Sequence, residues 1–192
     1  MSEHTTIIGV DPGLNGGMAI LHDSGVILEL RSIPLMPGRP KRIDWVGSMQ
    51  LLAKKVDWAL GGGAVLFASE RLSPMPKQFG GGAANYARGT SLCWMVAVSA
   101  IQQFHALSLP ERSDLRIKVV TVAPGRWQRL MLEGLPGGDT KQRAVLAVQR
   151  FWPADLAKFC PRGKYHDGLV DAALIAEWAR RTDNAVDRKE TT

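Results

Sequence analysis

The sequence predicts one α/β domain in which a mixed five-stranded sheet is flanked by helices. Two observations carry this prediction. Three short apolar segments near the N-terminus are separated by turn residues, which is the pattern of an antiparallel meander. The later segments alternate between helical spacing and short apolar runs, which is typical of parallel strands joined by helices. We therefore expect a single domain over residues 1–183 and a flexible polar tail over residues 184–192.

The strands of the meander are expected at residues 6–10, 18–22 and 26–33. The first is rich in β-branched residues, which suit a buried strand. Pro12, Gly13, Gly16 and Gly17 allow the chain to turn tightly into the second strand. A loop with three prolines follows the third strand. It carries three basic side chains that could contact a phosphate backbone or simply be solvated: Arg39, Lys41 and Arg42.

The remaining elements are predicted from the spacing of their apolar residues. Asp44 can cap a helix that runs to about Ala59, because its apolar residues recur every three to four positions. Three glycines stop this helix, and the run Ala64–Ala68 is expected to be a strand buried on both faces. The later elements are an unusually apolar helix over 83–104, a strand over 116–122, a short helix from Pro124, a helix from 139 or 140 to 151, and a last helix over 168–181.

The composition favours an anionic partner. Basic residues exceed acidic ones, which gives a net charge of +6, and such a surface attracts nucleic acid or an anionic membrane. No apolar stretch approaches a membrane span and no signal-peptide pattern is present, so we expect a cytoplasmic protein without a membrane partner. Cys93 and Cys160 lack C-x-x-C spacing, which indicates reduced thiols rather than a disulfide framework or a cysteine zinc site.

Acidic residues occur where two predicted strands end and where the last helix begins. Asp11 follows the first strand, and Glu70 follows the strand Ala64–Ala68. If these strands are parallel neighbours, their carboxylates emerge at one edge of the sheet. Asp167 and Asp171 are four residues apart, so they share one helix face, where like charges repel. The ordinary alternatives are an aspartate that caps a turn and a solvated pair of acids.

Three or four carboxylates from separate segments suit hard divalent ions such as Mg²⁺ or Mn²⁺. Two such ions can activate water and stabilise the leaving oxygen in phosphodiester cleavage. Lys141 begins a predicted helix, where backbone N–H groups favour phosphate, although a surface lysine fits this position equally well. His166 can serve as a ligand or simply pack against Tyr165. The acids are thus compatible with a metal-dependent phosphodiesterase centre, and the ordinary alternatives for each residue stay open at this point.

Several short segments, spread over about residues 6–180, occur in an order that resembles a known family. They are Gly9-Val10-Asp11-Pro12-Gly13 with Gly16-Gly17, Glu70, Trp127 after Pro124, Lys141 with Arg143, Phe151-Trp152-Pro153, and His166-Asp167-Gly168-x-x-Asp171-Ala172. This ordered set resembles the RuvC family of Holliday-junction resolvases, and its phage-type and chloroplast-type branch most closely.

The resemblance implies an RNase H-like fold and a homodimer that makes paired, symmetric nicks across a four-way DNA junction. The expected products carry a 5′-phosphate and a 3′-hydroxyl. Lys141 resembles the family's phosphate-contacting lysine. The acids that match its positions for two Mg²⁺ or Mn²⁺ ions are Asp11, Glu70, Asp167 and Asp171. His166 is an alternative to Asp167 as a ligand, and we favour Asp167. The protein is expected in the nucleoid, or in the host cytoplasm if a phage encodes it.

The same resemblance, together with the positions of basic side chains, suggests where DNA is bound. Phe79 is the candidate wedge between bases, with Met75 behind it. The apolar helix around 92–101 has more hydrophobic surface than one sheet face needs, so we expect it to join two subunits. The candidate DNA contacts are Lys77, Phe79, Arg88, Arg126, Arg129, Lys141 and Arg143.

Other interpretations of the sequence remain open at this point. The motif around Asp11 is also similar to the phosphate loop of actin-like and sugar-kinase folds, which usually need two such subdomains. A junction-binding or RNA-processing relative without cleavage would share most of these residues. The same chemistry could also act on another substrate, as in transposases or RNA-cleaving enzymes.

Overall fold

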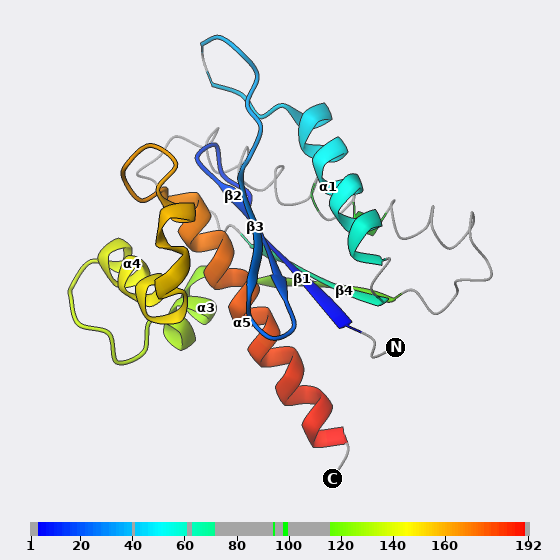
Figure 1. Cartoon of the computed structure of the whole chain (residues 1–192), viewed down its shortest axis with the longest axis vertical. Helices are drawn as coiled ribbons and strands as arrows, with labels where there is room; N and C mark the ends of the chain where they lie inside the picture. Colours follow the sequence, from blue (N-terminus) through cyan, green and yellow to red (C-terminus); the bar gives the residue numbers. More distant parts are fainter. Residues whose placement is uncertain are drawn as a thin grey trace.

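The computed structural model describes residues 4–39, 41–60, 63–71, 94, 98–99 and 116–190, and its centre is a five-stranded sheet (Figure 1). The strands are β1 (His4–Asp11), β2 (Gly17–His22), β3 (Ile27–Ser32), β4 (Gly63–Glu70) and β5 (Arg116–Val122). Their order in the sheet is β3-β2-β1-β4-β5. The pairs β1–β2 and β2–β3 are antiparallel, whereas β1–β4 and β4–β5 are parallel. The predicted mixed sheet is confirmed.

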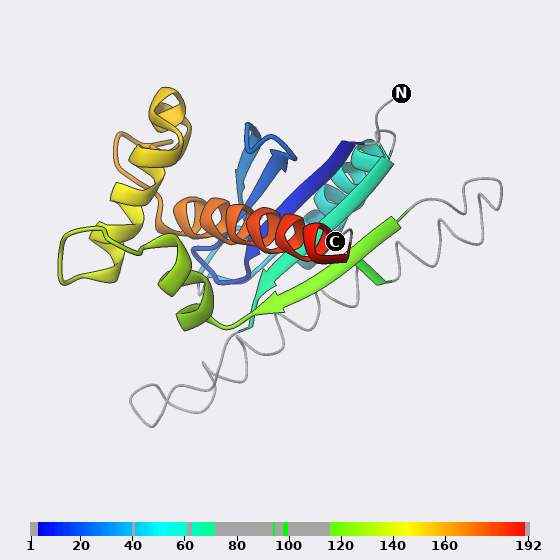
Figure 2. The ribbon, with the colours of Figure 1, turned by 90° about the horizontal axis from the view of Figure 1, so that it is seen from below.

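Helices cover both faces of this sheet, because the apolar residues of its central strands point alternately to either side. Ile7 of β1 belongs to a core on the side of α5 (Asp167–Glu190), whereas Ile8 belongs to a second core on the side of α1 (Trp45–Leu60). Figure 2 shows the two helices on opposite sides of the strands. Continuous apolar runs such as Val65–Ala68 are explained by this two-sided burial.

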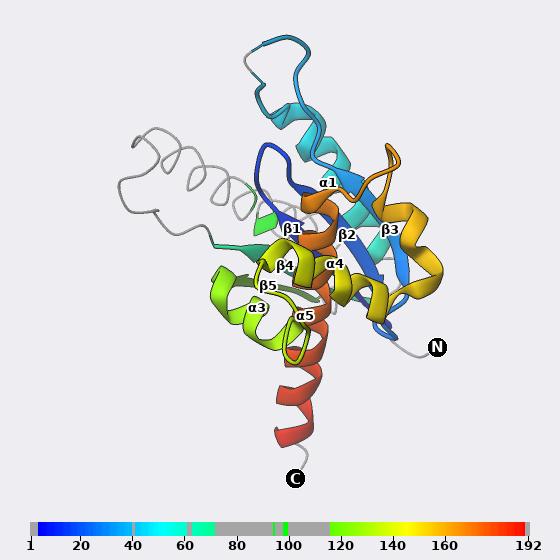
Figure 3. The same ribbon diagram turned by 90° about the vertical axis from the view of Figure 1, so that its left-hand side faces the viewer.

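Two further helices and a 3-10 helix connect β5 to α5. They are α3 (Pro124–Met131), α4 (Thr140–Phe151) and η2 (Pro153–Phe159). Pro124 begins α3, and the side chain of Asp139 caps α4 by accepting the backbone N–H of Lys141, as the sequence predicts. Figure 3 shows α3 next to the end of β5 and α4 beside the start of α5.

The elements after residue 71 differ from expectation at several points. The last helix was expected to end near Arg181, but α5 continues to Glu190. The 3-10 helix after Pro153 was not predicted. Of the expected helix over 83–104, the structure describes three positions, all helical, and Trp94 and Val98 belong to the core on the α1 side. The rest of that helix, including most of the proposed dimer contact, lies outside the described residues.

Within the part of the chain that the structure describes, no helix combines the length and apolar character that crossing a membrane would require.

Candidate metal centre

The topology of the sheet brings the first two acids together. Strands β1 and β4 run parallel with Val10 opposite Ser69, so Asp11 and Glu70 follow at adjacent positions where these two strands end. Antiparallel pairing of Asp11 with Gly17 places the β1–β2 turn at the same edge. The sequence-based prediction required the strands that end in Asp11 and Glu70 to be parallel neighbours. The structure confirms that β1 and β4 are.

The start of α5 reaches this edge through contacts that only glycine allows. Gly16 and Gly168 form a parallel backbone bridge. A Cβ atom on Gly168 would lie 2.1 Å from the carbonyl oxygen of Asn15, and one on Gly17 would lie 2.5 Å from the carbonyl oxygen of Gly168. The loop after β1 lies directly on the first turn of α5, and this close approach leaves no room for a side chain at Gly17 or Gly168. This contact sets Asp167 beside the loop.

Farther along α5, Gly9 lets the helix backbone rest on β1. A Cβ atom on Gly9 would lie 2.3 Å from the carbonyl oxygen of Ala172 and 2.6 Å from the nitrogen of Ala176. Both alanines are fully buried, so small residues line both sides of the contact. Asp171, which precedes Ala172, is thereby held close to the end of β1.

The pKa values of these carboxyl groups show that they act on one another. Burial, with Glu70 as the next cause, raises the pKa of Asp11 to about 7. Burial, with Asp11 as the next cause, raises the pKa of Asp171 to about 8. Burial also raises the pKa of Glu70. Burial and mutual repulsion therefore disfavour the ionised forms of these carboxyl groups in the metal-free protein, and such perturbed pKa values are common at functional sites.

The donor set fits a hard divalent cation. The carboxylate of Asp171 makes no hydrogen bond or ion pair with any described residue, and the carboxylate of Asp11 accepts one weak hydrogen bond, from the Gly13 backbone at 3.3 Å. Within the described residues, no three of the acids bring oxygen atoms within 4.8 Å of one another. Free carboxylate oxygens are the ligands that Mg²⁺ and Mn²⁺ prefer.

Lys141 presents its ammonium group to the candidate centre. Its ammonium group lies 2.6 Å from Oδ2 of Asp167, and both side chains are exposed. The hydrogen bond and the charge of Asp167 raise the pKa of Lys141, with smaller contributions from Asp139 and Asp171. The contact also places the N-terminal end of α4, whose dipole favours anions, next to the acids.

His166 acts in this structure as a cap of α5. The backbone N–H of Leu169 donates to Nδ1 of His166 at 3.3 Å, and the carbonyl of His166 accepts the N–H groups of Leu169 and Val170. Nδ1 of His166 is therefore engaged with the backbone of α5 in this structure, and neither nitrogen of His166 contacts an acid of the set. This arrangement favours Asp167 over His166 as the ligand.

Trp127 contributes a contact that the sequence did not predict. Its buried indole N–H donates to Oε1 of Glu70 at 2.8 Å, and this hydrogen bond opposes the rise in the pKa of Glu70. The resemblance had singled out Trp127, but no residue spacing indicates that an indole 57 positions away reaches a strand-ending acid. Trp127 therefore orients a carboxylate of the candidate centre.

The Trp127→Phe substitution is expected to weaken divalent-metal binding or activity by about 10- to 100-fold, which is typical when the partner of a ligand is removed. The matched control is Trp152→Phe, because the indole of Trp152 donates to the carbonyl of Gly25 at 2.8 Å, away from the acids. A titration of activity with Mn²⁺ would show the shift in the first variant alone. Equal shifts in both variants would contradict the role of Trp127.

Apart from Lys141, described above, the candidate DNA contacts fall into three groups. The first lies outside the described residues and comprises Lys77, Phe79, Arg88 and Met75, the second candidate for the wedge. Arg126 and Arg129 line a hollow of about 230 Å³ between α3 and α5, and the guanidinium of Arg126 lies 6.0 Å from the ring of Trp178. Nη2 of Arg143 donates to the carbonyl of Leu132 at 2.6 Å, so this guanidinium caps the C-terminal end of α3.

The loop after β3 forms a small basic hairpin, which we define as residues 35–39 and 41–43. Leu35 pairs with Ile43, and the N–H of Met36 donates to the carbonyl of Arg42 at 2.9 Å. The hairpin projects from the body of the molecule (Figure 1). Ser32 pairs with Gly17, which pairs with Asp11, so the hairpin leaves the sheet at the edge that carries the acids. Its exposed basic residues are Arg39, Lys41 and Arg42.

Comparisons with known proteins identify the fold. No family model and no curated protein matches the sequence. The structure of Thermus thermophilus RuvC matches with a TM-score of 0.50 and 17% identity, over 93% of this chain and 96% of that one. The T. thermophilus RuvC complex with a Holliday-junction substrate matches with a TM-score of 0.50 and 14% identity, over 95% of each chain. The yeast mitochondrial Holliday-junction resolvase Ydc2 matches with a TM-score of 0.44 and 13% identity, over 95% of this chain and 80% of that one. The mixed sheet, the helices on its faces and the two RuvC matches together show that this chain has the RuvC-like, RNase H-like fold.

Proposed function

We propose that the protein is a divalent-metal-dependent endonuclease that resolves four-way DNA junctions by paired, symmetric nicks. The observation that carries the proposal is the set of mutually interacting carboxylates at one edge of the sheet, with raised pKa values at Asp11, Glu70 and Asp171. The substrate class is supported by the fold shared with a RuvC structure that was determined on a Holliday-junction substrate.

The proposed roles follow from the contacts of each residue. The residues that would hold one or two Mg²⁺ or Mn²⁺ ions are Asp11, Glu70, Asp167 and Asp171. Such ions activate water and stabilise the leaving oxygen during phosphodiester hydrolysis, leaving a 5′-phosphate and a 3′-hydroxyl. Trp127 fixes the orientation of Glu70. Lys141 stands at a helix start beside Asp167, where it can neutralise charge on the scissile phosphate.

Paired nicks require two catalytic centres. The described part of this chain carries one set of four acids, so symmetric cleavage needs a second copy, and we propose that the active form is a homodimer. Sedimentation of the metal-free protein at micromolar concentration is expected to show the dimer. A monomer under these conditions that stays monomeric on junction DNA would contradict this part of the proposal.

The basic hairpin is expected to contact the phosphate backbone, because it leaves the sheet beside the acids. Changing Arg39, Lys41 and Arg42 together to Ala should weaken junction binding and make it less sensitive to salt. The slope of log K against log[salt] is expected to fall by about 0.9 for each phosphate that the variant no longer neutralises. Lys54→Ala, which removes an exposed charge on α1, is the control and should leave the slope unchanged. An unchanged slope in the triple variant would exclude the hairpin from the interface.

The proposed activity is tested by incubating the wild-type protein with a labelled synthetic four-way junction and Mg²⁺, and with a matched linear duplex. Mapping of the products should show paired nicks at symmetric positions on the junction and none on the duplex. The nicked ends should be joined by DNA ligase, since they carry a 5′-phosphate and a 3′-hydroxyl. Junction binding without cleavage in both Mg²⁺ and Mn²⁺ would instead show a binding protein of the same fold.

A further inference from the structure

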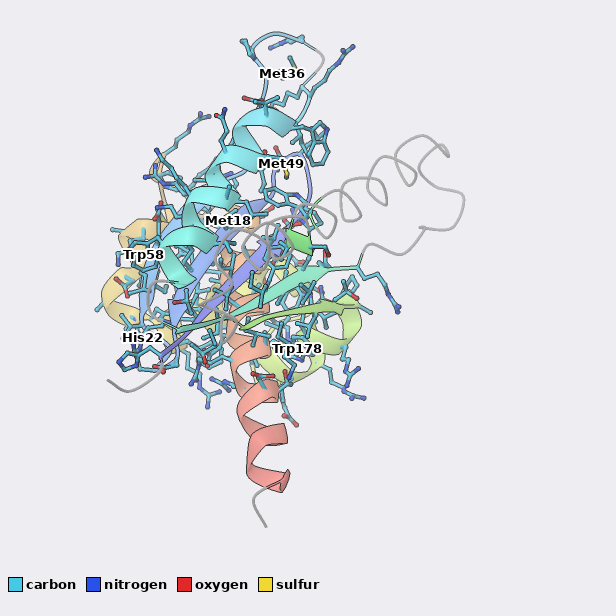
Figure 4. All side chains as sticks on the ribbon, turned by 90° about the vertical axis from the view of Figure 1, so that its right-hand side faces the viewer. Met18, His22, Met36, Met49, Trp58 and Trp178 are labelled. Carbon is cyan, nitrogen blue, oxygen red and sulfur yellow. The ribbon has the colours of Figure 1, made fainter. Side chains whose placement is uncertain are left out.

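A second group of metal-ligating side chains lies at the opposite end of the sheet from the acids. Thr6 of β1 pairs with His22 of β2, so His4, two residues earlier, lies on the same face as Thr6 and diagonally across from His22. Asp23 follows His22 at the start of the turn to β3. Figure 4 shows His22 at the far end of β2 from Met18, whose strand end adjoins Asp11. Because His4 and Asp11 are the first and last residues of β1, they lie about 23 Å apart.

The three side chains present two imidazoles and a carboxylate to one another. Nδ1 of His4 lies 3.5 Å from Oδ2 of Asp23, and Nδ1 of His22 lies 2.7 Å from Oδ1. One ligand atom from each residue falls within 4.8 Å of the other two, which no other group of three such residues achieves in the described parts of the chain. In a tetrahedral zinc site with bonds near 2.0–2.1 Å, ligand atoms stand roughly 3.3 Å apart. The distances of 2.7 Å and 3.5 Å lie on either side of this value, so a small rearrangement of the side chains would complete the set.

Nδ1 of His22 lies next to the carboxylate of Asp23, at 2.7 Å from Oδ1. It also lies 2.9 Å from Oγ of Ser24 and 3.2 Å from the backbone nitrogen of Ser24. In the Nδ1–H tautomer this nitrogen donates to Asp23, and a bound metal ion would take the place of that proton.

The turn that carries Asp23 is held by side chains from two other elements. Nη1 of Arg180 on α5 donates to the carbonyl of Asp23 at 3.1 Å. The indole N–H of Trp152 donates to the carbonyl of Gly25 at 2.8 Å, and Gly25 has a φ of +88°, which suits glycine. Asp23 and His22 are thus positioned before any ligand binds. The charge of Arg180, which interacts with Asp23, opposes a bound cation and limits its affinity.

We propose that His4, His22 and Asp23 form a binding site for a borderline transition metal, with Zn²⁺ as the expected ion and water in the fourth position. Imidazole nitrogen and carboxylate oxygen suit Zn²⁺, whereas Mg²⁺ prefers oxygen ligands alone. The bound ion would link His4, the first residue of β1, to Asp23 in the β2–β3 turn. The site differs from the proposed nuclease centre in both position and ligand chemistry. A test of Zn²⁺ binding here therefore does not depend on whether the protein is a nuclease.

The test is a calorimetric titration of the full-length protein with Zn²⁺ at pH 7.5, in excess Mg²⁺ so that the acid centre is occupied. Wild type should bind Zn²⁺ with micromolar affinity or tighter, and Zn²⁺ should raise its Tm. His4→Gln and His22→Asn should each weaken binding at least tenfold. Asp171→Asn, which alters the other centre, should leave the Zn²⁺ affinity unchanged.

Three results would overturn the proposal. The first is the absence of Zn²⁺ binding by wild type at 100 µM, which would show that a proton alone joins the histidines to Asp23. The second is retention of wild-type affinity in both histidine variants. The third is loss of Zn²⁺ binding in Asp171→Asn, which would place the ion at the acid centre. Substituting Co²⁺ and recording its visible absorption gives an independent readout of nitrogen ligation that does not depend on variant folding.

Discussion

Replacing Asp11 with Asn is expected to reduce junction cleavage by more than about 100-fold while junction binding persists. The expected loss exceeds that for removing a partner of a metal ligand, since here a ligand itself is changed. Asn keeps the shape of the side chain but lacks the charge that a divalent ion requires. Asp155→Asn is the control, because Asp155 pairs with Lys158 on η2 and belongs to no acid cluster.

The same substitution is expected to stabilise the metal-free protein at pH 8. The pKa of Asp11 is raised from 3.8 to about 7 in the folded state, so the folded protein binds more protons than the unfolded chain between these values. The free energy of unfolding therefore falls as the pH rises from about 4 towards 8. Removing the charge restores on the order of 2–4 kcal/mol at pH 8, and it also lowers the pKa of Asp171, whose largest charged neighbour is Asp11.

Urea unfolding at pH 5 and pH 8, with and without Mg²⁺, checks this expectation. Without metal, Asp11→Asn should exceed wild type in stability at pH 8, with a smaller difference at pH 5. Mg²⁺ should stabilise wild type and leave the variant almost unchanged. A variant that is less stable than wild type at pH 8 without metal would show that the acids do not repel one another as described.

Replacing Gly9 with Ala is expected to cost about 3 kcal/mol or more of stability and most of the activity. The added methyl group would lie 2.3 Å from the carbonyl oxygen of Ala172, where backbone rather than a flexible side chain must move. Overpacking usually costs 1–3 kcal/mol, and a clash with backbone belongs at the upper end. Because α5 carries Asp171 immediately before Ala172, any retreat of the helix separates the acids.

Gly125→Ala is the matched control for this prediction. Apart from its chain neighbours and the backbone of its own helix, no atom lies within 4 Å of the Cβ position at Gly125, which is part of α3. Alanine there should raise stability by up to about 1 kcal/mol, because glycine is the weaker helix former. Thermal unfolding and the junction assay measure both variants. Near-native stability and cleavage in Gly9→Ala would show that close packing of α5 on β1 is not what positions Asp171.

The sequence allowed the sheet and the acids to be predicted because local patterns determine them. Apolar runs that end in Asp11 and Glu70 indicate buried strands, and parallel neighbours necessarily end at one edge. The contact of α5 with Gly9 could not be predicted, because it depends on the crossing of two elements that are far apart in the sequence. The same holds for the hydrogen bond from Trp127 to Glu70, and for His4 reaching Asp23, since each is set by tertiary packing and not by spacing.

Helix boundaries were predicted less well than strands for a related reason. The polar residues after Arg181 suggested fraying, yet α5 continues to Glu190 because it extends a helix whose earlier turns are firmly buried. The proposed DNA-binding residues also differ in whether the sequence indicated their surroundings. The register of β1, β2 and β3 places the basic hairpin beside the acids. In contrast, the guanidinium of Arg143 donates a hydrogen bond to the carbonyl of Leu132 at the end of α3.

The central claim, that acids from β1, β4 and α5 together hold divalent ions, is tested most directly by crystals grown with Mn²⁺. Anomalous scattering locates Mn²⁺ independently of any assumption about ligands. The account predicts Mn²⁺ peaks in contact with the carboxylates of Asp11 and Asp171, and it predicts that these peaks are absent from Asp11→Asn. The claim would be contradicted if the protein cleaves junctions with Mn²⁺ but its crystals show Mn²⁺ peaks only at positions away from these carboxylates.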